Sequence, residues 1–319
     1  MNNRDEHAGH HLRLKKRASF FSVSVAIILA TAKLAVGITI NSLAIIAMAI
    51  DSIMDIVMSA ANFVGIRMAA QPADPEHPFG HGKFETMAAL FQGTVILGIG
   101  IFLTYEGVRR IVSGDTMATE GLQLGIAIMA VSAMVSLVLS RYLRRTARTT
   151  DSLALQTDSL HYSTDVWTNG GVMVALTVMF FVPWPWLDPL ISILIALYII
   201  KEALPLLGKV LNELAESALP ETQRQQITEI VLANREIVDL HDLRTRKSGS
   251  TKIMDMHITV CKNYTIKQAH DIADAVEASL KEQFADADIV IHLDPCSVKH
   301  CPEETPNTQC PIGKQTIKS

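Results

Sequence analysis

Two pairs of ionisable side chains interrupt segments that are otherwise apolar enough to cross a bilayer. Asp51 and Asp55 lie within Leu43–Ala70, and His161 and Asp165 interrupt another such segment. Each pair is spaced i, i+4, so its members lie on one face of a helix. Desolvating a charged group at bilayer depth costs at least about 2.5–3.5 kcal/mol, so groups kept there usually bind or carry something. Two facing helices could therefore offer three carboxylates and one imidazole to one ion; a polar helix contact that binds nothing is the alternative.

The donor set of these two pairs indicates which ions would suit the site. Carboxylate oxygens and one imidazole nitrogen favour tetrahedral Zn²⁺ and tolerate Fe²⁺ or Cd²⁺, whereas Cu⁺ prefers sulfur. The donor types do not choose among Zn²⁺, Fe²⁺, Cd²⁺ and Co²⁺. Asp158 lies three residues before His161, and an entry-vestibule or capping role is as consistent with its position as ligation.

A second cluster of possible ligands lies in the segment 71–83. Asp74, His77 and His81 fall within eight residues, and Gly80 and Gly82 allow the backbone to fold so that their side chains converge. This loop could supply three ligands. The alternative is a polar loop whose histidines cap the following helix.

A third cluster lies in the C-terminal part of the chain. His241, His257 and His292 are expected on strands, His270 on a helix, and Asp294 at the end of the last strand. An open sheet could bring the strand histidines together, and a bridging carboxylate would let two metals share one ligand. Solvent-facing histidines without function are the alternative.

Composition divides the elements that position these clusters between membrane and water. The chain has 319 residues, 49% of them hydrophobic and 19% charged, with a mean hydropathy of +0.26, which is too apolar for an ordinary soluble protein and too charged for an entirely membrane-embedded one. Windows of about 20 residues predict six spans. These are Phe20–Ile40, Leu43–Arg67, Met87–Val108, Leu122–Leu143, Val166–Phe181 with a polar lead-in from Asp151, and Leu187–Leu207.

The charges of the short loops predict the orientation. Basic residues concentrate in the N-terminal tail and in the connection between the fourth and fifth spans, so both termini are expected in the cytoplasm. The net charge of −4 and the lack of a basic stripe argue against nucleic acid as a partner. There is no signal-peptide cleavage pattern.

The apolar runs shorten after about residue 208, which predicts a separate soluble domain. Its expected elements follow the order αββαβ, typical of a small open α+β sheet of the ferredoxin-like or metallochaperone-like type with helices on one face. The predicted organisation is a tail at 1–18, a six-helix all-α transmembrane domain at 19–207, a metal-binding regulatory domain at 208–299 and a flexible tail at 300–319. The expected helices and strands are Glu221–Arg235, Val238–Arg246, Lys252–Cys261, Ile266–Phe284 and Asp288–Leu293.

Five strings of residues, in order and with matching spacings, resemble the cation diffusion facilitator family, most closely its bacterial zinc/ferrous-iron efflux branch. The resemblance runs from about Ser19 to Val298. The strings are Asp51-Ser-Ile-Met-Asp55, His77-Pro-Phe-Gly-His81-Gly-Lys83, Asp158-Ser-Leu-His161-Tyr-Ser-Thr-Asp165, His241-Asp-Leu-Arg-Thr-Arg246 and Ile291-His-Leu-Asp-Pro295.

This resemblance implies a homodimeric, proton-coupled antiporter of the bacterial inner membrane, and not an enzyme. It implies a dimer-stabilising contact between Lys83 and Glu216, where the branch is associated with Asp instead of Glu. Pro75 and Pro78 depart from the family pattern and stiffen the loop. The implied metal ligands are Asp51, Asp55, His161 and Asp165 for transport, Asp74, His77 and His81 in the loop, and His241, His257, His270, His292 and Asp294 in a cytoplasmic binuclear site.

Metal ligands must lose protons before they bind, so protons and metal are expected to compete for the transport site. Inward-flowing H⁺ would then drive Zn²⁺ or Fe²⁺ out of the cytoplasm. A membrane-bound metal sensor that binds without transporting is the main alternative. An intramembrane metalloenzyme is less consistent with the sequence, because there is no His-Glu-x-x-His motif.

Overall fold

The computed structural model describes residues 3–39, 43–113, 122–181, 187–284 and 286–296. The chain divides into two compact units, a helical unit at Gly9–Leu214 and a second unit that comprises Ala215–Ser319 with Met1–Ala8. The predicted C-terminal tail from residue 300, with Cys301 and Cys310, lies outside the described residues.

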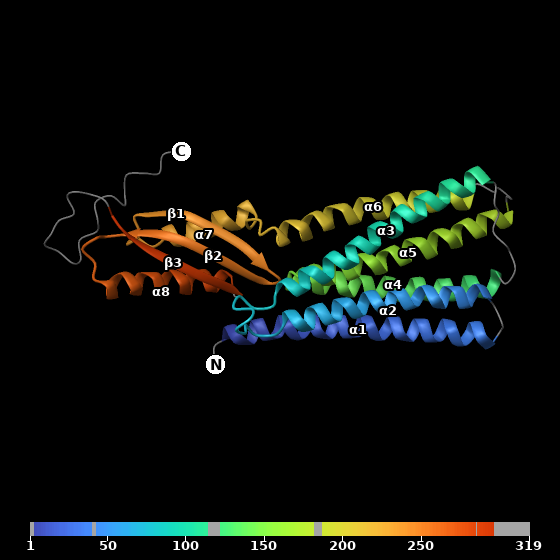
Figure 1. Cartoon of the computed structure of the whole chain (residues 1–319), viewed down its shortest axis with the longest axis horizontal. Helices are drawn as coiled ribbons and strands as arrows, with labels where there is room; N and C mark the ends of the chain where they lie inside the picture. Colours follow the sequence, from blue (N-terminus) through green and yellow to red (C-terminus); the bar gives the residue numbers. More distant parts are fainter. Residues whose placement is uncertain (1–2, 40–42, 114–121, 182–186, 285, 297–319) are drawn as a thin grey trace. The chain divides into compact units, whose positions relative to one another are not determined.

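Long helices build the first unit, and Figure 1 shows them running side by side. The sequence favours helices here because its apolar runs are long. They are α1 (Asn3–Thr39), α2 (Leu43–Ala69), α3 (Lys83–Ser113), α4 (Leu122–Thr150), α5 (Leu153–Phe181) and α6 (Leu187–Leu214).

Four of these helices contain a stretch that is long and apolar enough to cross a membrane, judged over the described residues. These stretches are His10–Ala35, Ser52–Ala69, Lys83–Ser113 and Pro189–Leu214. The helices α4 and α5 are not among them. Six spans therefore stay a prediction.

The helices pack most extensively as two pairs, α4 with α5 and α3 with α6. Glycines bring α3 close to α6: a Cβ at Gly100 would lie 2.8 Å from Ile200, and one at Gly107 would lie 2.6 Å from Ile193. Small residues at a helix interface let backbones approach, which is the main source of packing energy where lipid replaces water.

A buried ion pair fastens α1 to α3. Lys15 Nζ lies 2.8 Å from Glu85 Oε2, and both side chains are almost fully buried. Ser152, just before α5, donates a hydrogen bond to the other oxygen of Glu85. This cluster therefore ties α1 to the start of α3 and the start of α5.

The second unit is a three-stranded sheet with two helices. It contains α7 (Glu221–Leu232), β1 (Asp239–Ser248), β2 (Thr251–Val260), α8 (Ile266–Gln283) and β3 (Ala287–Pro295). The strand order is β1-β2-β3, with β1 antiparallel and β3 parallel to the central β2. Thr265 starts α8 through a capping box with Gln268.

Both helices of this unit contribute to one core against one face of the sheet. Met254, Met256 and Ile258 alternate along β2 and are buried with Ile227 of α7 and Ile272 of α8. Because side chains alternate between the two faces of a strand, the residues between these positions lie on the face without helices. That uncovered face carries the histidine cluster.

Candidate metal centres

The first centre brings together side chains from α2 and α5. Asp55, His161 and Asp165 each offer one ligand atom, and these atoms lie within 4.8 Å of one another. His161 Nε2 lies 3.3 Å from Asp55 Oδ1. The i, i+4 spacing of the α5 pair and the contact between α5 and α2 produce this convergence.

The Nε2 atom of His161 is buried, and it forms an ion-pair contact with Asp55. The set of two carboxylates and one imidazole fits a divalent cation such as Zn²⁺. Asp51 lies one turn before Asp55 on α2; its side chain lies outside the described residues.

A cavity of about 170 Å³ adjoins this centre and is lined by both Asp55 and Asp165. Lys33 of α1 also lines it and donates a hydrogen bond of 2.7 Å to Ser52. The carboxylates thus have space beside them for an ion or water.

A buried polar network surrounds the centre. The Tyr162 hydroxyl lies 3.0 Å from Ser59 Oγ and accepts a hydrogen bond of 3.3 Å from Ser22, which links α5 to α2 and α1. Asp158 is fully buried and accepts a hydrogen bond of 3.1 Å from Gln92 Nε2. Asp158 is not part of the group of converging ligands.

Gln92 and Asn62 were missed by sequence reasoning. Gln92 accepts a hydrogen bond from Asn62, whose amide also donates to the Ala154 carbonyl at 3.1 Å. Amides within apolar helices were a signal that could have revealed both residues, because such groups require partners when they are buried.

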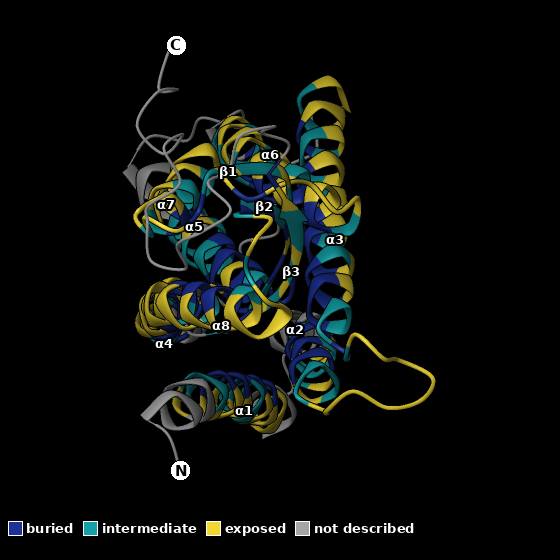
Figure 2. Cartoon of the chain, turned by 90° about the vertical axis from the view of Figure 1, so that its left-hand side faces the viewer, coloured by how far each residue is buried: buried dark blue, intermediate teal, exposed yellow. Residues whose placement is uncertain are grey.

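The second centre lies in the loop between α2 and α3, which Figure 2 shows as a largely exposed segment. Asp74, His77 and His81 offer ligand atoms within 4.8 Å of one another. Asp74 Oδ1 accepts a hydrogen bond of 2.6 Å from the His77 backbone N–H, and Asp74 Oδ2 lies 3.3 Å from His81 Nε2. Gly80, with a φ of 79°, makes the turn that returns His81 to Asp74.

Electrostatics favour the ionised form of this carboxylate. The hydrogen bond from the His77 backbone N–H, assisted by the nearby histidines, lowers the pKa of Asp74 from its ordinary value. His81 is buried, and its Nδ1 lies 3.1 Å from the Pro72 carbonyl oxygen. If Nδ1 carries the proton, Nε2 keeps its lone pair and can coordinate a metal ion.

The third centre lies on the uncovered face of the sheet. The register aligns His241 of β1, His257 of β2 and His292 of β3 in one row. Asp294 lies two residues beyond His292 on the same face, and its Oδ2 is 3.2 Å from His241 Nε2 and 3.0 Å from His257 Nδ1. The hydrogen bond with His257, assisted by the neighbouring histidines, lowers the pKa of Asp294.

The other two residues expected at this centre lie differently. His292 Nε2 is 3.4 Å from Asp294 Oδ1, at the margin of the group formed by His241, His257 and Asp294. His270 lies exposed on α8, with its Nε2 3.6 Å from Asp274, and is not part of that group. Since α8 packs on the opposite face of the sheet, the strand register could not bring His270 to the row.

The two residues of the expected dimer contact each have a partner within their own unit. Lys83 Nζ donates a hydrogen bond of 2.6 Å to the Glu213 carbonyl oxygen. Glu216 Oε1 accepts one of 2.7 Å from Arg246. Glu213 is itself buried and accepts a hydrogen bond of 2.5 Å from Thr86, a role that the sequence did not reveal.

Comparisons with known proteins match almost the whole described chain. The family model described as "Cation efflux transmembrane domain" matches residues 19–215, and "Cation efflux protein, cytoplasmic domain" matches residues 219–296. The chain is 36% identical over 286 residues to the cation-efflux pump FieF of Salmonella choleraesuis (strain SC-B67), which covers 90% of this chain and 94% of the relative. It is 35% identical, with the same coverage, to FieF of Salmonella newport (strain SL254).

One solved structure, the zinc form of a putative zinc transporter CzrB, is 27% identical over 24% of this chain and 90% of its own length, with a TM-score of 0.23.

Proposed function

Because the chain belongs to the cation diffusion facilitator family of cation efflux proteins, we propose that it exports a divalent metal ion from the cytoplasm in exchange for protons. The proposed transport site consists of Asp51, Asp55, His161 and Asp165. The proposed substrates are Zn²⁺, Fe²⁺ and Cd²⁺, which share a preference for this oxygen and nitrogen donor set.

One observation carries this assignment. Asp55, His161 and Asp165 offer ligand atoms within 4.8 Å of one another, and the buried Nε2 of His161 lies beside the Asp55 carboxylate. The helix that bears Asp55 also bears Asp51 one turn earlier, on the same face, where a fourth ligand would complete a tetrahedral set.

Exchange follows from the chemistry of these ligands. A carboxylate and an imidazole bind metal only after they lose their protons, so each ion that enters the site displaces H⁺. If the site opens alternately to the two sides of the membrane, protons that enter from outside release the metal there. The proton gradient then drives metal out of the cytoplasm.

Reconstituted vesicles test this proposal. We expect a pH gradient to drive Zn²⁺ transport by the wild-type chain and metal to drive proton movement, and we expect Asp51→Ala or Asp165→Ala to abolish both. Glu106→Ala is the matched control, because this acid on α3 pairs with Arg109 and Arg110 and takes no part in the metal centres. Normal coupling in both site variants would overturn the assignment.

A membrane-bound sensor that binds metal without moving it is the second candidate function. The loop and sheet centres support such a role, since they offer metal ligands outside the helical spans. Metal accumulation separates the candidates: cells with an efflux protein retain less Zn²⁺ than cells that lack the gene, whereas a sensor alone leaves accumulation unchanged.

The sheet centre supports a regulatory role within the transporter. We propose that His241, His257, His292 and Asp294 bind regulatory metal. We also propose that the cytoplasmic domain forms a homodimer and that Lys83 and Glu216 form a contact that stabilises this dimer. Metal that binds only the closed dimer favours that state by mass action. Distance measurements between the two cytoplasmic domains with and without Zn²⁺ test this, and equal distances would contradict it.

Location and topology complete the proposal. We propose a bacterial inner-membrane protein with six spans, both termini in the cytoplasm and the loop centre on the cytoplasmic side. The Arg-rich end of α4 and the basic residues of α1 support this orientation, because short cytoplasmic segments carry an excess of Lys and Arg. Cysteine labelling of residues in the loop between α2 and α3, from either side of the membrane, tests it.

A further inference from the structure

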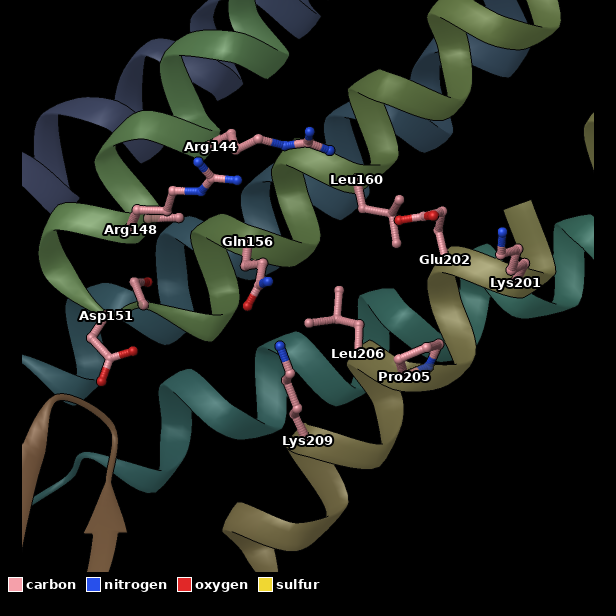
Figure 3. Close-up of a pocket in the computed structure, with 12 residues that line it drawn as sticks. Arg144, Arg148, Asp151, Gln156, Leu160, Lys201, Glu202, Pro205, Leu206 and Lys209 are labelled. Atoms are coloured by element: carbon pink, nitrogen blue, oxygen red, sulfur yellow. The ribbon is translucent and has the colours of Figure 1, made fainter. Parts of the chain in front are cut away.

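A cavity of about 680 Å³ lies between α4, α5 and α6, and none of the candidate metal ligands lines it. Figure 3 shows four basic side chains around it: Arg144 and Arg148 come from α4, and Lys201 and Lys209 come from α6. The volume falls within the range of small-molecule sites, roughly 300–1,000 Å³.

The charge of this cavity excludes a path for the exported cation. Four cationic side chains face two carboxylates, those of Asp151 and Glu202, so two positive charges remain. Among the residues that the structure describes, none of the four basic side chains forms an ion pair. An uncompensated positive field repels Zn²⁺ and attracts an anion.

The walls of the cavity also have an apolar part. Leu160 of α5 and Leu206 of α6 line it and are otherwise buried. The basic residues of α6 are two helical turns apart, a rise of about 12 Å along the helix. The cavity therefore combines the two kinds of surface that an amphiphile needs, and a free inorganic anion would leave the apolar part without a contact.

We propose that this cavity binds the headgroup of an anionic phospholipid from the cytoplasmic leaflet. The arginines and lysines hold its phosphate, since basic pockets between membrane helices on the cytoplasmic side recognise anionic headgroups. Leu160 and Leu206 contact its glycerol and the first carbons of its chains. The inference requires that α4–α6 lie in the membrane; it does not require that the protein couples metal to protons.

The position of this site gives the bound lipid a structural consequence. α4 packs mainly with α5, and α6 packs mainly with α3. A lipid held by Arg148 of one pair and Lys209 of the other bridges the two helix pairs. Release of the lipid would leave like charges facing each other across the cavity.

Native mass spectrometry of the full-length protein in detergent tests the proposal. We expect dioleoylphosphatidylglycerol, the anionic probe, to bind the wild-type chain more tightly than dioleoylphosphatidylcholine, the neutral one. Arg148→Gln/Lys209→Gln should weaken binding of the anionic lipid about thirtyfold, the effect of removing two basic partners. Binding of the neutral lipid should not change.

Arg141→Gln/Arg145→Gln is the matched control. It removes two exposed arginines from the same segment of α4, outside the cavity, and should keep wild-type affinity. Equal binding of the two lipids by the wild-type chain, or equal losses in the two double variants, would overturn the proposal. Displacement of the anionic lipid by an equal concentration of inorganic phosphate would identify a free anion as the ligand and would also overturn it.

Discussion

His161 Nε2 on α5 lies 3.3 Å from Asp55 Oδ1 on α2, so an imidazole and a carboxylate from two different helices meet inside the helical unit. Asp165 is close enough to complete a group with them. The sequence predicts that each pair of ionisable residues lies on one face of its helix. The distance between the two pairs is set only by the packing of α2 against α5.

Replacing Asp55 by Asn tests whether the group of Asp55, His161 and Asp165 binds a metal ion. The amide keeps the shape of the side chain but loses the charge and is a poor ligand for Zn²⁺. We expect Zn²⁺ transport into vesicles to fall to background while thermal unfolding changes little. Asp271→Asn, on the exposed face of α8, should transport normally; wild-type transport by Asp55→Asn would contradict the site.

At the sheet centre, Asp294→Asn should weaken Zn²⁺ binding, because Asp294 contacts both His241 and His257. The hydrogen bond with His257 lowers the pKa of Asp294, so its carboxylate stays ionised as the pH falls from 7 to 5. Calorimetric titration with Zn²⁺ measures this. The full chain used for it carries Asp165→Ala, which removes a ligand of the proposed transport site. Asp288→Asn on the same strand is the control, and equal affinity in both variants would disprove the role.

The buried pair of Lys15 and Glu85 should be costly to break. Glu85→Gln leaves the Lys15 charge without an anionic partner, which costs about 3–5 kcal/mol of unfolding free energy. Lys15→Met/Glu85→Gln removes the stranded charge and should recover part of this loss. Disruption of the exposed pair Lys267–Asp271 by Asp271→Asn should cost less than about 1 kcal/mol. Similar losses for the buried and exposed pairs would contradict the argument.

Close packing of α2 against α3 depends on Gly65. A Cβ there would lie 2.5 Å from the Ala88 Cβ and 3.0 Å from the Phe84 carbonyl oxygen, so backbone would have to move. Gly65→Ala should therefore destabilise the helical unit by about 1–3 kcal/mol. Gly98→Ala meets nothing within 4 Å and should be neutral or slightly stabilising, because alanine favours helix. Thermal unfolding of both variants in detergent measures the difference, and equal stabilities would refute it.

Local patterns predict the elements well where a single periodicity dominates. The expected strand Lys252–Cys261 and the observed β2, Thr251–Val260, differ by one residue at each end, because alternation of buried and exposed residues marks the strand directly. The expected span Met87–Val108 is shorter than α3, Lys83–Ser113. A hydropathy window ends where polar residues begin, whereas backbone hydrogen bonds continue the helix through them.

Residue type and spacing identify the candidate ligands. They do not predict which of these ligands lie close together in the folded chain. His241, His257 and Asp294 converge because the register of three strands aligns them. His270 has the same chemistry and stays apart because its helix covers the other face. Residue type and periodicity are local properties, so a sequence shows them.

The sequence by itself therefore determined the helical and α+β parts of this protein, the family to which it belongs, and the side chains available to hold metal. The tertiary structure decided that Asp55 meets His161, that Gln92 contacts Asp158, and that a basic cavity lies between α4 and α6. Each of these relationships joins residues from different elements. Their distances depend on how whole helices and strands pack, and no local pattern of residues encodes that packing.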